Sequence, residues 1–148
     1  MDPSSVIMSP VSQERAQVRR VSSGTAWEPV VGYSRAVAAG DFVFVSGCTS
    51  VDGADFVHEG DAYAQAVQAI SNVRAALDGL GTSLSDVVRT RMYVTDISRW
   101  AEIGRAHAEA FGDARPATSM VQVAALIDPR MLVEVEAVAF RPGVGSVG

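Results

Sequence analysis

Residues 131–140 form the most strongly patterned segment of the chain, and they constrain its fold more than any other feature. Their side chains alternate with a period of two, which is the period of a β-strand, because successive side chains of a strand point to opposite faces of a sheet. After Met131, one face of this strand would present only valine and alanine, whereas the other would carry the carboxylates of Glu134 and Glu136. The chain is therefore expected to form a sheet with one apolar, buried face.

Two earlier segments predict a β-hairpin. Residues 41–47 are rich in Phe and Val, which favours a largely buried strand, and Gly47 would end this strand or introduce a bulge. Residues 33–38 also have a strand pattern and connect to the first segment through the turn Ala39-Gly40. The two strands are therefore expected to pair.

Two more strands are predicted further along the chain. Residues 86–96 alternate as a half-buried strand does. Arg115-Pro116 restarts the chain in an extended conformation, and residues 118–125 then favour a strand. The buried face of the first of these strands is expected to consist of Val88, Thr90, Met92 and Val94.

Apolar residues at steps of three and four predict two amphipathic helices. The first would begin after Asp61, whose carboxylate would cap it, and the second after Ser98. The apolar face of the first helix consists of Ala66, Ile70, Val73, Leu77 and Leu80. Its outward-facing residues are expected to include Gln65, Gln68, Arg74 and Asp78. The apolar face of the second consists of Ile103, Ala106, Ala110 and Phe111.

These elements follow each other in the order β-β-α-β-α-β-β, which predicts an α+β fold with two helices on one face of a mixed sheet. The domain is expected to span residues 18–141, after a disordered leader of residues 1–17 and before a flexible tail of residues 142–148. The opposite face of the sheet must then meet solvent or other subunits.

Composition excludes several classes of function. No apolar run approaches the roughly 20 residues that cross a bilayer, so no membrane association is expected. Cys48 is the only cysteine, and together with His58 and His107 it gives too few ligands for zinc. We therefore expect no metal, no other cofactor and a reducing compartment, the cytoplasm. The net charge of −5 and the lack of a basic run disfavour nucleic acid as a partner.

Five segments, in matching order, resemble the RidA/YjgF family of reactive-intermediate deaminases. They are Gly32-Tyr33-Ser34-Arg35-Ala36-Val37, Phe44-Val45-Ser46-Gly47, Asp86-Val87-Val88-Arg89-Thr90, Arg115-Pro116-Ala117 and Val133-Glu134-Val135-Glu136-Ala137. The resemblance covers about residues 18–141. It implies a chorismate-mutase-like fold, a homotrimer whose sheets form a central barrel, and small-molecule clefts between adjacent subunits.

Three positions at the implied cleft depart from the family pattern. Thr118 stands where deaminase members carry an arginine that binds the substrate carboxylate, and Met120 stands where they carry a cysteine. Cys48 occupies a position that is often polar. Because a hydroxyl lacks the charge and the paired donors of a guanidinium, a substrate other than the standard 2-iminoacid is expected.

Other cleft positions match the family. Glu134, which the resemblance implies orients or activates water, is the candidate catalytic residue, and Tyr33 and the backbone at Gly47 are implied to line the cleft. A carboxylate in a partly dry cleft can have its pKa raised toward neutrality, as general acid or base catalysis requires. The alternative role for Glu134 is a structural contact between subunits.

Arg105, Arg91 and Arg115 are candidates for a cation that replaces the missing arginine. Arg105 could instead pair with Glu102 or Glu109 on its own helix, and Arg91 with the acidic side chains of the last strand. These structural roles remain open alternatives to the binding roles.

Cys48 and His107 are the remaining reactive groups. Cys48 would be a nucleophile if its pKa were lowered, but a small buried side chain is the favoured interpretation. His107 is interpreted as a surface or half-buried histidine beside the apolar face of its helix.

The sequence thus predicts a homotrimer that hydrolyses or deaminates an imine or enamine metabolite. The alternative is a metabolite-binding or regulatory trimer without turnover. Ribonuclease activity, an older association of the family, is disfavoured by the acidic net charge.

Overall fold

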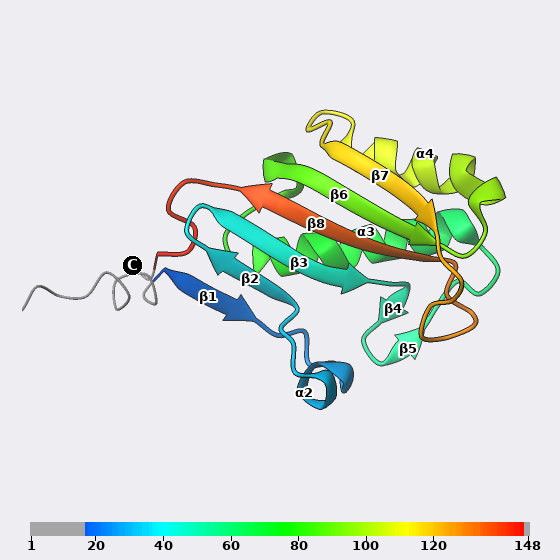
Figure 1. Cartoon of the computed structure of the whole chain (residues 1–148), viewed down its shortest axis with the longest axis horizontal. Coiled ribbons are helices and arrows are strands. Elements are labelled where there is room, and N and C mark those ends of the chain that lie inside the picture. Colours follow the sequence, from blue (N-terminus) through cyan, green and yellow to red (C-terminus); the bar gives the residue numbers. More distant parts are fainter. Residues whose placement is uncertain (1–16, 147–148) are drawn as a thin grey trace, which may run out of the picture.

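A six-stranded mixed sheet, in the order β1-β2-β3-β8-β6-β7, forms the centre of the structure (Figure 1). The structure is a computed structural model and describes residues 17–146. All neighbouring strands are antiparallel except β6 and β7, which run parallel. The strands are β1 (Val18–Val21), β2 (Ala36–Ala39), β3 (Phe42–Cys48), β6 (Val87–Val94), β7 (Ala117–Gln122) and β8 (Val133–Phe140).

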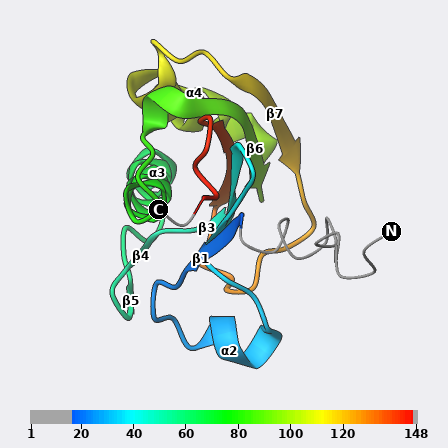
Figure 2. The ribbon, with the colours of Figure 1, turned by 90° about the vertical axis from the view of Figure 1, so that its left-hand side faces the viewer.

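Two helices, α3 (Ala62–Asp78) and α4 (Trp100–Phe111), lie together on one face of the sheet (Figures 1 and 2). A short helix, α2 (Trp27–Val31), lies beyond the ends of β1 and β2. The strands β4 (Val51–Asp52) and β5 (Asp55–Phe56) form a separate small hairpin. The predicted α+β fold is confirmed, and none of the described helices is long and apolar enough to cross a membrane.

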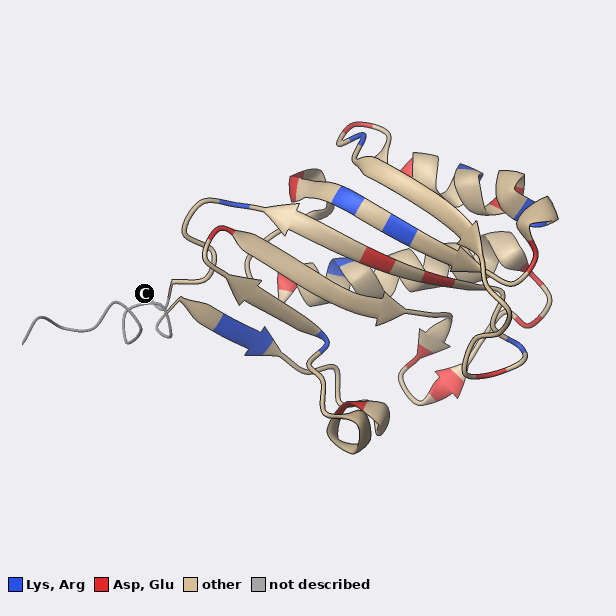
Figure 3. Ribbon diagram, viewed as in Figure 1, with Lys and Arg blue, Asp and Glu red and all other residues tan. Residues whose placement is uncertain are grey.

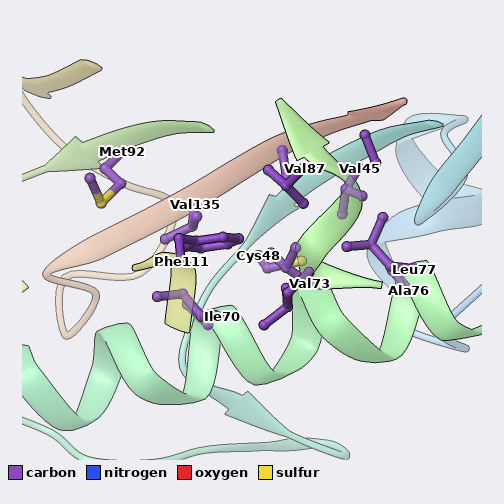
Figure 4. Packing of buried hydrophobic residues seen from close by; sticks show 14 of the residues in the cluster. Val45, Cys48, Ile70, Val73, Ala76, Leu77, Val87, Met92, Phe111 and Val135 are labelled. Carbon is purple, nitrogen blue, oxygen red and sulfur yellow. The ribbon is translucent and has the colours of Figure 1, made fainter. Parts of the chain in front are cut away.

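The core lies between the two helices and the sheet (Figure 4). Leu77 of α3 and Ile103 and Phe111 of α4 are fully buried there, as the predicted apolar faces require. Each such side chain contributes about 1.5–3 kcal/mol relative to an exposed one. The helices therefore cover one face of the sheet firmly, and the candidate site must lie on the other face or at an end.

The strand pattern that constrained the fold most is confirmed. Val133 and Val135 of β8 are completely buried under the helices, whereas Glu134 and Glu136 are half-buried on the opposite face. Figure 3 shows these acidic positions on β8 beside the basic positions of β6. None of the helices in residues 17–146 covers this second face, which we call the open face.

The N-terminal part of the fold differs from the prediction. Strand β2 begins at Ala36, and β1 and α2 were not predicted. Gly32, at a φ of 86°, stops α2, because its N–H and that of Tyr33 both donate to the Glu28 carbonyl. This left-handed backbone conformation at the C-terminal end of a helix favours glycine. Residues 33–35 therefore form the connection into β2 and are not part of a strand.

Gln65 was predicted to point outward, and this prediction was wrong. Its side chain is completely buried and donates to the carbonyls of His58 and Arg130, at 3.1 and 3.0 Å. Its amide oxygen accepts from the N–H of Leu132 at 2.8 Å. Gln65 therefore satisfies three backbone groups of two loops that pack over α3.

Two local predictions also need correction. Val88 is exposed and Val87 is buried, because the pairing of β6 with β8 shifts register between residues 87 and 89. Ser98 does not cap α4: the Asp96 carboxylate accepts from the Ser98 N–H at 3.0 Å and caps a short 3₁₀ turn before Trp100. Asp61, in contrast, caps α3 as predicted, accepting from Ala64 N–H at 3.0 Å.

Residues 17 and 145, near the two limits of the described part of the chain, lie beside the β2–β3 turn. The Gly145 N–H donates to the Gly40 carbonyl at 2.8 Å, and the Gly40 N–H donates to the Gln17 carbonyl at 3.0 Å. Val144, which lies in the predicted tail, is buried in the core. The packed domain thus continues to residue 145, while residues 1–16 of the predicted leader and residues 147–148 lie outside the described residues.

Candidate functional site

Glu134 lies directly over Gly47 of the neighbouring strand β3. A Cβ atom added to Gly47 would be 2.6 Å from Cδ of Glu134, which is closer than real Cβ contacts come. The pairing of β3 with β8 also shifts register between Val45 and Cys48, so Gly47 lies in a bulge. The glycine lets the carboxylate pack directly on the backbone, and a larger residue would displace the Glu134 side chain.

The pKa of the Glu134 carboxyl is raised above its ordinary value. Burial is the main cause, repulsion by the carboxylate of Glu136 adds to it, and attraction to Arg35 opposes it. A carboxyl group in this environment exchanges a proton closer to neutral pH than an exposed one does. The shift is in the direction that favours general acid–base catalysis near neutral pH.

Arg35, the cation that attracts this carboxyl, is itself buried. Only 9% of its surface is exposed. Its Nη1 donates to the Gly47 carbonyl at 2.7 Å, and its Nη2 donates to the Tyr33 hydroxyl at 3.3 Å. Its Nε donates to the Ser23 hydroxyl, also at 3.3 Å. A buried guanidinium with acceptors on three segments is rigid, because its hydrogen bonds compensate for lost hydration.

The loop before α2 is held by Glu28. This buried carboxylate accepts from the hydroxyls of Ser23 and Thr25, at 2.5 and 2.7 Å, and from both backbone N–H groups. Burial disfavours its charge, but the hydrogen bonds outweigh burial and lower the pKa of Glu28 to about 2. Glu28 therefore stays ionised and fixes the loop against Arg35.

An open hollow of about 760 Å³ lies between this loop and the start of β2. Tyr33, Ser34 and Ser46 contribute polar groups to it. The side chain of Arg35 contacts both Tyr33, which lines the hollow, and Gly47, on which Glu134 packs. The other lining residues are Arg20, Ser22, Gly24, Thr25, Glu28, Pro29, Gly32 and Val37.

Cys48 is a packed side chain with a neutral thiol. It is 3% exposed, and burial is the main reason that its pKa is raised, although Arg35 opposes the shift. Its Sγ lies 3.6 Å from Nη1 of Arg35. A thiol with a raised pKa forms little thiolate near neutral pH and is a poor nucleophile.

Thr118 and Met120 lie elsewhere in the chain, on the edge strand β7. Thr118 Oγ1 is 2.7 Å from Thr90 Oγ1, and Thr90 Oγ1 is 2.8 Å from Nε2 of His107 on α4. Met120 packs against the core from the same side. Strand β6 separates them from β8, so one copy of the chain does not bring Thr118 and Met120 together with Glu134.

The three candidate arginines have different surroundings. The guanidinium of Arg105 stacks over the ring of Tyr63, with 4.0 Å from Cζ to the ring centre. It is not paired with Glu102, whose carboxylate pairs with Arg99 at 2.9 Å. Arg91 lies opposite Glu136 on the open face, and Arg115 follows α4.

Sequence reasoning predicted Glu134, Gly47 and Tyr33, which the structure brings into one neighbourhood, but it missed Arg35. No periodic pattern marked Arg35, because it precedes the strand and acts through backbone acceptors. The sequence did contain one indication. An arginine immediately before an apolar strand must either reach solvent or find buried hydrogen-bond acceptors. Tyr93 was also missed: its hydroxyl donates to the Glu136 carboxylate.

The structure is thus an α+β domain in which the Glu134 carboxyl, packed between two neighbouring strands, has a raised pKa. The family profile described as Endoribonuclease L-PSP matches residues 23–141. With that match the chain belongs to the RidA/YjgF family, as its sequence segments suggested.

Relatives support the same assignment. A crystal structure from Mycobacterium tuberculosis, of a member of the YjgF/YER057c/UK114 family, is 51% identical, with a TM-score of 0.76 over 83% of this chain and 98% of that chain. The yjgF gene product of E. coli is 28% identical, with a TM-score of 0.73 over 83% and 98%. The 3-aminoacrylate deaminase RutC of Acinetobacter baylyi is 36% identical over 75% of this chain and 88% of its own length.

Proposed function

We propose that the protein is an enzyme that hydrolyses the C–N bond of a small imine, or of an enamine after its conversion to the imine. The observation that carries this proposal is the half-buried Glu134 carboxyl, held over Gly47 with a raised pKa. The similarity to a relative named as a 3-aminoacrylate deaminase supports the same class of C–N bond.

The proposed reaction balances in two steps. Glu134, as carboxylate, takes a proton from water while the water oxygen bonds to the imine carbon, and it passes this proton to the imine nitrogen, which becomes an amine. Glu134 then takes the hydroxyl proton of this tetrahedral intermediate and gives it to the leaving nitrogen, so that the carbonyl group forms, the C–N bond breaks and ammonia leaves. An enamine first gains a proton at carbon and loses one from nitrogen to give the imine.

The substrate is proposed to lack the carboxylate of the standard 2-iminoacids. The family's carboxylate-binding arginine is replaced by Thr118, whose hydroxyl is 3.1 Å from its acceptor, the Pro116 carbonyl. A hydroxyl in this position offers no positive charge to an acid. Loss of a desolvated charged partner of this kind weakens binding by about 2–5 kcal/mol.

The working form is proposed to be a homotrimer, in which the open face of each sheet is covered by another copy. Phe42, Phe44 and Phe140 are 42%, 50% and 43% exposed and form an aromatic patch on this face, with 5.3 Å between the ring centres of Phe42 and Phe140. A second copy packed on this face would cover the patch.

Ammonia release from a panel of imines tests the proposed function. We expect acceleration with imines that lack a carboxylate, loss of it in E134Q, and no acceleration with freshly generated 2-aminoacrylate. Clear acceleration with 2-aminoacrylate would overturn the substrate assignment. Ligand binding without turnover, equal in the wild type and E134Q, would instead support the metabolite-binding alternative.

The substitution T118R provides a second test of the proposed substrate class. It restores a guanidinium on β7, and we expect it to introduce turnover of 2-aminoacrylate. Failure of T118R, with wild-type activity on neutral imines intact, would show that Met120 or Cys48 also excludes the acid.

A further inference from the structure

Arg35 joins the two halves of the candidate site. The Arg35 side chain contacts Gly47, which lies under Glu134, and Tyr33, which lines the hollow. No other described side chain hydrogen-bonds to both of these residues. A buried cation in this position determines the geometry on both sides, because its planar fork fixes the direction of each hydrogen bond.

The first effect of Arg35 concerns the bulge of β3. The Ser46 N–H donates to the Arg35 carbonyl at 2.9 Å, the Ser46 hydroxyl donates to the Ser34 carbonyl at 2.7 Å, and Arg35 Nη1 donates to the Gly47 carbonyl at 2.7 Å. These three bonds hold residues 46 and 47 against residues 34 and 35. Since Glu134 packs on the α-carbon of Gly47, the position of the carboxylate depends on this bulge.

The second effect concerns the Tyr33 hydroxyl. Its oxygen accepts from Arg35 Nη2, and the centre of its ring lies 5.5 Å from Cζ of Arg35. Because the guanidinium has only donors, Tyr33 cannot donate to it, and its own proton must point elsewhere. The Tyr33 hydroxyl donates to no acceptor within residues 17–146, so it is available as a donor to a ligand in the hollow.

We propose that Arg35 is a positioning residue of the site: it fixes the bulge that receives Glu134 and orients the Tyr33 hydroxyl as a hydrogen-bond donor to the substrate. This inference rests on the proposed function, and it adds the requirement that the substrate carry an acceptor for the Tyr33 hydroxyl.

Several charged or titratable groups face Glu134 and need to be separated from the effect of Arg35. Glu136 lies on the same strand and Cys48 on β3, and Tyr93 and Arg91 come from β6. Only Arg35 among them also contacts the Gly47 carbonyl. Removal of Arg35 therefore changes the charge near Glu134 and the bulge together, whereas a lysine would restore the charge alone.

The variants R35Q and R35K test the proposal, with R74Q on the exposed surface of α3 as a control that removes the same charge. We expect R35Q to lower kcat/KM on the order of 100-fold, the loss that a misplacement of about 1 Å causes. The acid limb of its pH–rate profile should move to higher pH, because the Glu134 carboxylate loses an attracting cation. R35K should restore the acid limb but not kcat/KM, and R74Q should match the wild type.

A titration by ¹³C NMR of the glutamate carboxyl groups tests Arg35 independently of turnover, with the Glu134 signal assigned by its absence in E134Q. Movement of this signal's midpoint to higher pH in R35Q supports the proposal even where no substrate is turned over. An unchanged midpoint and an unchanged acid limb in R35Q would overturn it. Where R35Q fails to fold, Y33F replaces it. A raised KM of Y33F, with an unchanged Glu134 midpoint, supports the role of the Tyr33 hydroxyl as a donor to the substrate. An unchanged KM overturns this role.

Discussion

The carboxyl group of Glu134 rests on the backbone of Gly47, with 2.6 Å between Cδ and the point where a Cβ would be. The contact joins two neighbouring strands on the open face of the sheet. Because the carboxylate packs on a main chain that has no side chain to move away, its position is set by the bulge beneath it. The site can therefore be disturbed by a change of one methyl group.

G47A is expected to abolish turnover at little cost in stability, because the added methyl group displaces the flexible end of the Glu134 side chain. Ammonia release and thermal unfolding measure the two effects. G104A serves as the control, since its Cβ would meet nothing closer than 4.0 Å and helix α4 would gain about 0.5–1 kcal/mol. Wild-type turnover by G47A would contradict the contact.

E134Q is expected to be more stable than the wild type near neutral pH. Burial, and then Glu136, raises the pKa of Glu134 in the folded protein. The stability that this group contributes is therefore complete below its unfolded pKa and is lost as the pH rises through its folded pKa. Glutamine has no charge to bury at any of these pH values. Unfolding by urea should show an advantage for E134Q at about pH 7.5 that disappears near about pH 4. A pH-independent difference would contradict this account.

F44E is expected to break the proposed trimer into monomers, because it places a charge in the aromatic patch that another copy would cover. Sedimentation equilibrium measures the assembly. V67E on α3 is the matched control, since Val67 is also exposed, at 44%, but lies on the helical side. A trimer that persists in F44E, or a monomeric wild type, would rule out the open face as the interface.

Q65L is expected to cost about 3 kcal/mol of unfolding free energy, because it leaves the carbonyls of His58 and Arg130 and the N–H of Leu132 buried without partners. Urea unfolding measures this loss. Q68L provides the comparison one turn nearer the middle of α3: Gln68 is half-buried, water can replace its bonds, and the cost should stay below about 1 kcal/mol.

The elements with long periodic patterns were predictable from the sequence. The alternation of β8 and the apolar face of α3 repeat over many residues. Burial of these apolar side chains therefore outweighs the local conformational preferences of single residues. Strand β1 and helix α2 were not predictable in this way, since they have four and five residues and depend on pairing with β2 and on the Glu28 carboxylate. Gln65 was misjudged because a polar residue beside an apolar face is usually solvated, and only the two distant loops show its acceptors.

The site was predictable where a side chain matched a pattern and unpredictable where it acts through the main chain. Glu134 and Tyr33 were found by resemblance, and in the structure Arg35 contacts Tyr33 and also Gly47, on which Glu134 packs. Arg35 itself binds a carbonyl that any residue would provide, so only its position before an apolar strand indicated a buried role. The separation of Thr118 from Glu134 within one chain depends on strand order, which local patterns do not encode.

The close approach at Gly47 ties the evolution of two positions together. As long as a long side chain occupies position 134, a larger residue at position 47 must displace it. A shorter residue at position 134 would remove this restriction on position 47. The pair of residues at these positions in a descendant gene would then record whether its carboxylate chemistry had been kept or abandoned.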